Sequence, residues 1–327
     1  MLGLAVLALS IAAALIVGPA DLGISDVYAV LAQHLWGRPA DIAPIDDGIV
    51  WELRLPRALL AAICGAGLGI CGAILQSLLR NPLADPFMLG ISSGASTGAV
   101  LVVVAGVGGA LTLSGGAFVG AVIAFVLVLA LATAAGGGPD RVVLAGVAGT
   151  QLFSALTAMV VFSSANAQQT RGVLFWLLGS LGGASWYQVV MCGLVCAACL
   201  GVCWLQSDAL DAFAFGRDAA AALGVPVRRV RIILLMTTAL LTAVLVSVAG
   251  AIGFVGLVLP HAARMIVGPS HRRLLPVTAI AGAVFLVWVD AAARTVFAPQ
   301  ELPVGVVTAL VGVPIFMWIL ARRRRIR

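Results

Sequence analysis

The sequence predicts an all-α polytopic membrane protein with about ten transmembrane helices. Hydrophobic residues make up 62% of the 327 residues, whereas charged residues make up only 10%. A soluble globular domain has about 25% charged residues, because charged side chains must cover its surface. A membrane-spanning helix needs about 20 apolar residues, so this chain holds enough apolar sequence for about eight to ten spans. The same composition excludes a disordered, collagen-like or disulfide-stabilised protein.

All 19 basic residues are Arg, and the chain contains no Lys. P-loop ATPases and Schiff-base enzymes both need a Lys side chain, so the sequence excludes these two classes. The net charge of +6 does not indicate nucleic-acid binding, because four of these Arg, 322 to 325, directly follow a hydrophobic run. Basic residues next to a span are typical of the cytoplasmic side of a membrane protein.

The first half of the chain predicts five spans, which are residues 2–18, 57–79, 87–106, 113–135 and 142–164. Residues 2–18 lack a charged region before them, which favours a retained helix over a signal peptide. The run 86–139 contains no charged side chain and is long enough for two spans, which turn among the glycines of 106–116. Between the first two spans lies an acidic outer loop, 20–55, with a short predicted helix at 25–36 that Ser25 caps.

The second half predicts five more spans, which are residues 186–206, 230–250, 253–267, 275–296 and 303–321. The run 232–263 is longer than one span needs, and Arg clusters flank it on both sides. The positive-inside rule places both clusters in the cytoplasm, so we expect a hairpin that turns near Gly250, Gly253 and Gly256. The segment Val173–Leu181 is too short to cross a bilayer and predicts a re-entrant or interfacial segment.

An even number of spans places both chain termini on the same side of the membrane. In this arrangement the cytoplasmic loops contain 14 of the 19 Arg, which supports the topology as a whole. The main cytoplasmic loop, 207–229, contains a short predicted helix at Asp218–Leu223 that Gly224 and Pro226 end. We therefore expect a single transmembrane domain over residues 1–327, with both termini in the cytoplasm.

One motif resembles a cofactor site but has a structural interpretation. Gly67–Gly72 matches the G-x-G-x-x-G fingerprint of dinucleotide-binding proteins, which requires a preceding strand. Here the motif lies inside a predicted span. Gly65, Gly69 and Ala73 form a small-residue face at a spacing of four, which favours close helix packing.

A second motif is consistent with a serine hydrolase, which is a less favoured alternative. Gly90–Gly94 matches the nucleophile elbow G-x-S-x-G, with Ser92 or Ser93 as the candidate nucleophile. An intramembrane serine hydrolase would need one of them to meet a His. The candidates are His34, His261 and His271.

Four Cys, at positions 192, 196, 199 and 203, form a stripe on one face of a predicted span. The stripe extends about 16 Å along the helix axis. Four sulfurs so far apart cannot all lie about 2.3 Å from one metal ion. We therefore expect these side chains to pack in the core, with no metal site.

Asp290 and Arg294 are a charged pair with i, i+4 spacing near the outer end of a predicted span. A local ion pair and a functional site are both consistent with this pair. Other ionisable residues are scarce inside the spans, whereas an ion-coupled carrier needs carboxylates at the middle of the membrane. This scarcity argues that the energy for transport comes from another chain.

Seven sequence strings together resemble one family. They are R-L-P-R at 54–57, G-A-I-L-Q-S-L-L-R-N-P-L-A-D-P at 72–86, L-G-I-S-S-G-A at 89–95, G-F-V-G-L-V-L-P-H-A-A-R at 253–264, H-R-R-L-L-P at 271–276, D-A-A-A-R at 290–294 and E-L-P-V-G-V-V-T-A-L-V-G-V-P at 301–314. In this order, over nearly the whole chain, they make the sequence similar to FecCD-type permease subunits. These subunits belong to bacterial type II ABC importers for iron–siderophore complexes, haem and vitamin B12.

The resemblance implies a type II ABC importer permease fold with ten helices per subunit, in the bacterial inner membrane. It also implies a homodimer or a pair of homologues, two separate ATPase subunits and a periplasmic binding protein. ATP and Mg would be bound by the ATPase, and the permease would bind no cofactor, have no catalytic residue and be no enzyme.

The resemblance also implies roles for individual residues. Arg54, Arg57 and Arg294 match outer arginines that meet acidic residues of the binding protein. The residues expected to couple to the ATPase are Arg217, Asp218, Ala221, Leu223 and Gly224. The residues expected in the outer gate are Val173, Trp176, Leu177 and Ser180. The expected substrate is an iron chelate, siderophore or haem, with cobalamin as the alternative. A secondary carrier and a serine hydrolase are less favoured.

Overall fold

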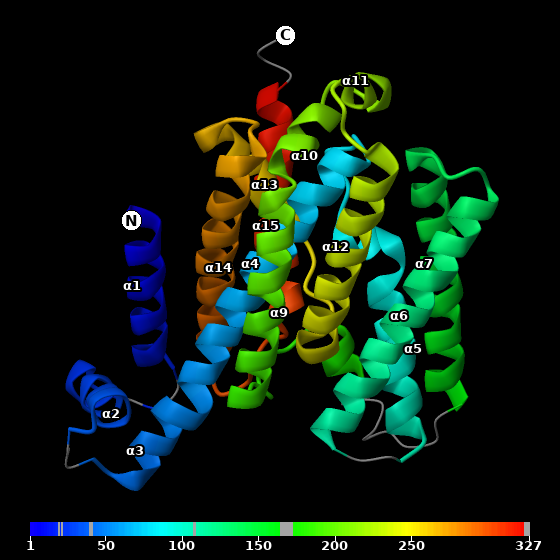
Figure 1. Ribbon diagram of the computed structural model, residues 1–327. Coiled ribbons are helices and arrows are strands. Elements are labelled where there is room, and N and C mark those ends of the chain that lie inside the picture. Colours follow the sequence, from blue (N-terminus) through cyan, green and yellow to red (C-terminus); the bar gives the residue numbers. More distant parts are fainter. Residues whose placement is uncertain (19, 21, 39–41, 107–108, 164–172, 324–327) are drawn as a thin grey trace.

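The computed structural model describes residues 1–18, 20, 22–38, 42–106, 109–163 and 173–323 (Figure 1). Within these ranges every regular element is a helix. The first half forms α1 (Leu2–Ile16), α2 (Ile24–Trp36), α3 (Pro44–Gly48), the π-helix η1 (Ile49–Arg54), α4 (Leu55–Leu78), the 3-10 helix η2 (Pro86–Leu89), α5 (Ile91–Val104), α6 (Ala110–Ala134) and α7 (Pro139–Ser163). The second half forms α9 (Trp186–Leu205), α10 (Ser207–Phe213), α11 (Arg217–Ala222), α12 (Val227–Ala249), α13 (Val255–Val267), α14 (His271–Thr295) and α15 (Val304–Arg323).

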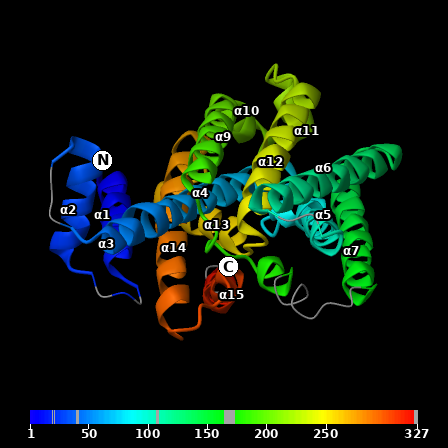
Figure 2. The same cartoon turned by 90° about the horizontal axis from the view of Figure 1, so that it is seen from below.

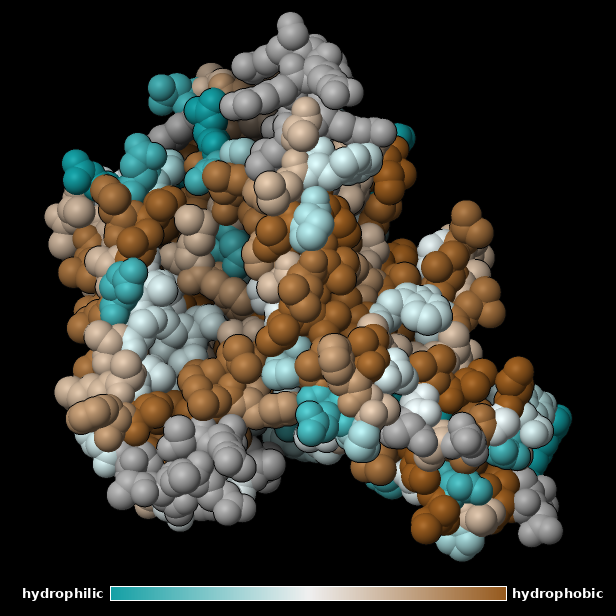
Figure 3. All heavy atoms as spheres, turned by 180° about the vertical axis from the view of Figure 1, so that it is seen from behind, coloured by the Kyte–Doolittle hydropathy of each residue, from teal (hydrophilic) through white to brown (hydrophobic). Residues whose placement is uncertain are grey.

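Six helical stretches among the described residues are long and apolar enough to cross a bilayer. They are Pro44–Leu78, Thr112–Ala134, Pro139–Ser163, Trp186–Leu205, Val227–Ala249 and His271–Thr295. Four further apolar helices are shorter, at Leu2–Ile16, Ile91–Val104, Val255–Val267 and Val304–Trp318. Hydrophobic side chains cover most of the middle of the face in Figure 3, and hydrophilic ones gather toward its ends. This distribution fits a chain surrounded by lipid.

Helix α4 is the central element of the fold, and most of its residues are buried. It packs against α9, α12, α13 and α14, and Figure 2 shows it running through the middle of the molecule. Its glycines allow very close crossings. A methyl group on Gly72 would lie 1.9 Å from the carbonyl oxygen of Gly256 in α13, and one on Gly65 would lie 2.1 Å from that of Gly282 in α14. A methyl group on Gly69 would also lie 3.1 Å from Thr278 of α14, so the predicted small-residue packing face is confirmed at Gly65 and Gly69.

Helices α5, α6 and α7 form a second group beside α12 (Figures 1 and 2). Glycines again let two backbones meet, because a methyl group on Gly98 of α5 would lie 2.1 Å from the carbonyl oxygen of Gly116 in α6. The motif 90–94 lies where η2 passes into α5, and Gly90 makes that turn with φ 73°. No strand precedes it among the described residues, so the expected setting of a nucleophile elbow is missing.

The predicted hairpin in the run 232–263 is confirmed. Helix α12 ends before Gly250, α13 begins at Val255, and Figure 1 shows the two running in opposite directions. The predicted outer-loop helix is present as α2, but its N-cap is Gly23 and not Ser25. The Gly23 amide donates a hydrogen bond of 2.8 Å to the Asp26 carboxylate, so the N-cap lies two residues earlier than predicted.

The four Cys of α9 are buried, as expected for packing residues. Their face lies against α4 and α12. The Cys196 sulfur lies 3.9 Å from the carbonyl oxygen of Ile63, and the Cys199 sulfur lies 3.8 Å from that of Thr237. Soft sulfur-containing side chains are well suited to such core positions.

Candidate functional site

Two polar clusters lie at opposite ends of α4. One contains Arg57, near the start of the helix, and we call it the Arg57 cluster, formed by Arg57, Asp290, Arg294 and Glu301. The other contains Ser77, near the end of the helix. We call it the His271 relay, formed by Ser77, His271 and Asp211. Each cluster joins residues far apart in the sequence, which only the fold brings together.

Arg57 binds two carboxylates through different parts of its guanidinium group. Its Nε donates to both oxygens of Asp290, at 2.9 and 3.1 Å, and its Nη1 donates to both oxygens of Glu301, at 2.9 and 3.1 Å. Arg294 pairs with the same Asp290 at 3.2 Å. Two positive and two negative charges thus neutralise one another, as buried charges require. The i, i+4 pair of Asp290 and Arg294 is therefore part of a larger network.

Arg54, which lies close to the Arg57 cluster in the sequence, and Arg294 of the cluster both bind the end of α1. Arg54 donates hydrogen bonds to the carbonyl oxygens of Leu15, Ile16 and Ala20, at 2.6, 3.1 and 2.6 Å. Arg294 donates to the carbonyl oxygen of Ala14 at 3.1 Å. The last carbonyl groups of a helix have no partner within the helix, so Arg side chains stabilise this end of α1.

The three arginines expected to meet a binding protein are largely buried in this chain. Arg54, Arg57 and Arg294 are only 5%, 8% and 4% exposed. The chain's own carboxylates and carbonyl oxygens bind these guanidinium groups, and their contact with a binding protein stays a prediction. The half-exposed member of the cluster is Glu301, whose side chain is 39% exposed, whereas that of Asp290 is 1% exposed.

The segment expected to form a gate lies against the ends of α12 and α15. Residues 173–177 are helical, and the chain then continues without helix to 181. The amide of Ser180 donates to the carbonyl oxygen of Ala249 at 2.9 Å, and the amide of Val304 donates to that of Gly179 at 2.9 Å. Of the expected gate residues, Val173 is buried, and Trp176, Leu177 and Ser180 are half-buried.

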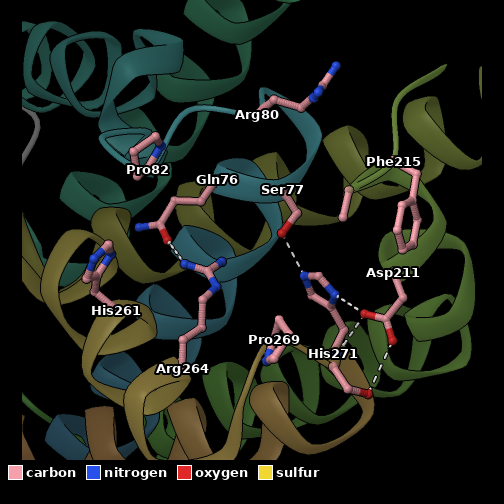
Figure 4. A pocket seen from close by; sticks show the side chains of 12 residues that line it. Gln76, Ser77, Arg80, Pro82, Asp211, Phe215, His261, Arg264, Pro269 and His271 are labelled. Carbon is pink, nitrogen blue, oxygen red and sulfur yellow. Dashed lines mark hydrogen bonds and ion pairs between the residues drawn. The ribbon is translucent and has the colours of Figure 1, made fainter. Parts of the chain in front are cut away.

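The His271 relay connects α4, α10 and α14 (Figure 4). The Ser77 hydroxyl lies 2.6 Å from His271 Nε2, and His271 Nδ1 lies 2.5 Å from Asp211 Oδ1. Because a carboxylate only accepts hydrogen bonds, Nδ1–H is the donor to Asp211. The same carboxylate accepts from the His271 amide at 2.9 Å and from the Ser270 hydroxyl at 3.2 Å. Asp211 therefore holds the start of α14.

The relay forms one wall of a cavity of about 540 Å³. On another wall Arg264 donates to the side-chain oxygen of Gln76 at 2.5 Å, and Gln76 donates to the carbonyl oxygen of Gly256 at 3.1 Å. Figure 4 shows the Arg264–Gln76 pair and the His271 relay across the cavity from each other, with the Arg80 side chain directed away from both. The cavity therefore has a hydrogen-bonded polar lining at this end of α4.

The residues expected to couple to an ATPase lie on or next to α11, at the same end of the molecule as α10 (Figure 1). Arg217 begins this helix, Asp218 and Ala221 are exposed, and Leu223, just after it, is 70% exposed. Gly224 has φ 82° and ends the turn. The structure also contains a helix that the sequence analysis missed, α10, which carries Asp211.

The described serine–histidine contact lies outside the motif 90–94, whose favoured interpretation was already structural. Ser93 donates a hydrogen bond to the carbonyl oxygen of Gly90, and the serine that meets a His is Ser77. His34 pairs instead with Asp47 at 2.8 Å and stacks on Trp51. The sequence offered no signal for the Ser77–His271 contact, because the two residues are separated by 194 positions.

Asp85 is a further acid near the end of α4, and it is half-buried. It lies between α4 and η2, and its carboxylate caps η2 by accepting a hydrogen bond of 2.9 Å from the Phe87 amide. Burial raises the pKa of Asp85 to about 6, although the hydrogen bond from Phe87 lowers it in part. An Asp directly before Pro is a recognisable capping signal in the sequence.

Comparison with known proteins places this architecture in a family. The sequence model of the FecCD transport family matches residues 6–322. The chain belongs to the FecCD transport family. The earlier family resemblance is thereby confirmed for nearly the full length of this FecCD chain.

Two relatives of the FecCD chain carry different substrates in their names. The cobalamin import system permease protein BtuC of Halobacterium salinarum is 42% identical over 243 residues, covering 74% of this chain and 65% of the relative. The chain thus spans just under two thirds of that relative's length. The hemin transport system permease protein HmuU of Yersinia pestis is 39% identical over 249 residues, covering 74% of each chain.

A solved structure has the same fold as this FecCD chain. It is described as an inward-facing conformation of a metal-chelate type ABC transporter. The two chains superpose with a TM-score of 0.85 at 28% identity, covering 98% of this chain and 97% of the other. The helices of this chain thus have the same arrangement as those of a solved ABC transporter chain.

Proposed function

We propose that this FecCD chain is the membrane-spanning permease subunit of an ATP-driven type II ABC importer. The observation that carries the proposal is the family match over residues 6–322, together with the structural match over 98% of the chain. The permease performs no covalent chemistry. Closure of partner ATPases moves α11 and switches which side of the passage is open.

The proposed topology has ten spans in the bacterial inner membrane. The four shorter apolar helices join the six long ones in crossing the bilayer, and all ten form a single transmembrane domain. The Arg57 cluster lies at the periplasmic side, whereas α11 and both termini lie in the cytoplasm. The many Arg of the loops around α11 and α14 support this orientation through the positive-inside rule.

The proposed complex contains two copies of this chain, two ATPase subunits and a periplasmic binding protein. ATP and Mg are bound by the ATPase subunits, and the permease binds no cofactor. Helix α11 and Leu223 offer an exposed surface to the ATPase. The Arg57 cluster offers the binding protein an Arg whose guanidinium group already binds two carboxylates. The segment 173–181 forms the outer gate.

The proposed substrate is a large metal chelate, with an iron chelate as the first choice and cobalamin as the alternative. The relative named for hemin and the metal-chelate transporter support the first choice. The relative named for cobalamin supports the alternative. Uptake of radiolabelled ferric siderophore, haem and cobalamin by vesicles containing the full complex would distinguish them.

Native mass spectrometry of the tagged chain, purified from its own membrane in mild detergent, tests the proposed function. We expect two copies of this chain with two ATPase chains. A chain that purifies alone under several mild conditions would contradict the importer and favour a carrier. Labelling by a serine-reactive fluorophosphonate, lost in Ser77→Ala, would instead favour a hydrolase, because Ser77 is the serine that contacts His271 and Asp211 through the relay.

A further inference from the structure

We propose that Glu301 competes with the docking partner for Arg57, so that docking breaks the Arg57–Glu301 ion pair and loosens the gate segment. The docking partner is the periplasmic binding protein, and one of its acidic side chains takes the place of Glu301 at Arg57. This inference rests on the proposed function, because it assumes that the Arg57 cluster is the docking site. It assigns to Glu301 a regulatory role inside that site.

The two carboxylates bound to Arg57 differ in accessibility. The Asp290 side chain is 1% exposed and is also bound by Arg294, so it is fixed inside the molecule. The Glu301 side chain is 39% exposed and binds only the Nη1 side of Arg57 through the contacts described. Of the two carboxylates bound to Arg57, Glu301 is therefore the one that an incoming carboxylate can displace.

Glycine keeps the approach to this position open. Gly182 is exposed, and a methyl group on it would lie 3.9 Å from Arg57 Nη1 and 3.9 Å from Glu301 Oε2. Gly183 beside it is also exposed and has no neighbouring atom within 4 Å of such a methyl group. A side chain from another protein can thus approach Arg57 past two residues that lack side chains.

The charges explain why the exchange needs an acidic partner. Loss of Glu301 alone would leave two Arg with one carboxylate in a buried cluster, which is unfavourable. Replacement by another carboxylate restores the neutral arrangement, with two-pronged hydrogen bonds of the same kind. The Arg57–Glu301 ion pair therefore stays intact until an acidic side chain of the binding protein replaces Glu301.

Glu301 is connected to the gate segment by a short stretch of backbone. It lies three residues before α15, which begins at Val304. The amide of Val304 donates to the carbonyl oxygen of Gly179 at 2.9 Å, and the amide of Gly305 donates to that of Leu178 at 3.1 Å. Displacement of Glu301 therefore moves the residues that hold the segment 173–181.

The test compares Glu301→Gln with Glu52→Gln in the full importer complex in lipid nanodiscs. Glu52 is a matched control, because it is exposed, lies close to the same end of α4 and loses the same charge. We expect Glu301→Gln to lower the Kd for the cognate binding protein about two- to fivefold relative to Glu52→Gln, the range for a half-exposed ion pair. Equal or weaker binding by Glu301→Gln would overturn the competition.

A third variant separates this inference from the docking assignment. Gly182→Leu fills the approach without changing any charge, and we expect it to weaken docking at least tenfold. If it does and Glu301→Gln binds like the control, docking occurs here but the competition is wrong. If neither variant changes the affinity, the docking site lies elsewhere, and both ideas fail. Thermal unfolding and ATPase assembly of each variant establish that it is folded.

The gate half of the proposal has its own measurement. We expect Glu301→Gln to raise ATP hydrolysis by the complex without binding protein, because the start of α15 is no longer held by Arg57. The Glu52→Gln complex should keep the wild-type rate. An unchanged rate in Glu301→Gln would overturn the connection between Glu301 and the segment 173–181.

Discussion

Ser77 Oγ and His271 Nε2 lie 2.6 Å apart, and Nδ1 of the same His271 ring donates a hydrogen bond to Asp211. The three residues belong to α4, α14 and α10, and α10 directly precedes α11. A displacement of α10 therefore acts on the end of α4 and the start of α14 together.

We expect Asp211→Ala to destabilise the protein, because the His271 amide, His271 Nδ1 and the Ser270 hydroxyl all lose their acceptor. A buried donor without a partner costs about 1–3 kcal/mol. Asp208→Ala is the control, since Asp208 is exposed in the same helix. Thermal unfolding in detergent measures the difference. Equal melting temperatures of the two variants would mean that the relay contributes nothing.

Gly72→Ala should be among the most damaging small substitutions in the chain. The added methyl group would lie 1.9 Å from the carbonyl oxygen of Gly256, so α4 and α13 must separate. Overpacking of this kind costs about 1–3 kcal/mol or more. Gly201→Ala is the matched control, because no atom lies within 4 Å of its added methyl group. We expect it to be neutral or slightly stabilising, since Ala favours a helix.

A pH dependence should follow from Asp85. Its pKa is about 6 in the folded chain and lies near 3.8 when exposed, so the folded state holds the proton more tightly. The resulting stability is fully present below about pH 4 and is lost as the pH rises through about 6. Asp85→Asn keeps the cap without titrating, so its melting temperature should fall less than that of the wild type between pH 4 and 7. If the melting temperatures of the two proteins change in parallel with pH, the raised pKa of Asp85 is contradicted.

Asp290→Asn should destabilise the protein far more than Glu301→Gln does. Asp290 pairs with both Arg57 and Arg294 and is buried, so its loss leaves two buried positive charges with one carboxylate. Removal of one partner from a buried ion pair costs about 3–5 kcal/mol, whereas a partly exposed pair contributes about 0–1 kcal/mol. Chemical unfolding curves of the two variants give this comparison. A similar loss in both would mean that burial does not decide their contributions.

The sequence predicted the positions of the apolar helices well, because hydrophobicity over about 20 residues is a local property. The hairpin at Gly250 was also predictable, since the Arg on either side require it. Helix α10 was missed because it is short and lies next to the predicted span that became α9. The helix has no side-chain N-cap, and its packing, with Leu210 and Phe213 buried, distinguishes it from a loop.

The polar clusters were much less predictable. Arg57 and Glu301 are separated by 244 positions, and the sequence gives their charges but not their pairing. For the same reason the sequence did not show that carboxylates and helix-end carbonyl oxygens of the same chain surround Arg57 and Arg294. The family resemblance pointed to these positions, and the burial emerged only from the packing of α1, α4 and α14.

All six Cys of the chain are buried among packed helices. A water-soluble maleimide should therefore react slowly with the native cysteines. These cysteines then need not be replaced before a new Cys is introduced for labelling. A single Cys introduced at Gly182 or Leu223, both exposed, would become a selective attachment point for a fluorophore or spin label. Distances between labels at these two sites could then follow both ends of the molecule during one cycle of ATP hydrolysis.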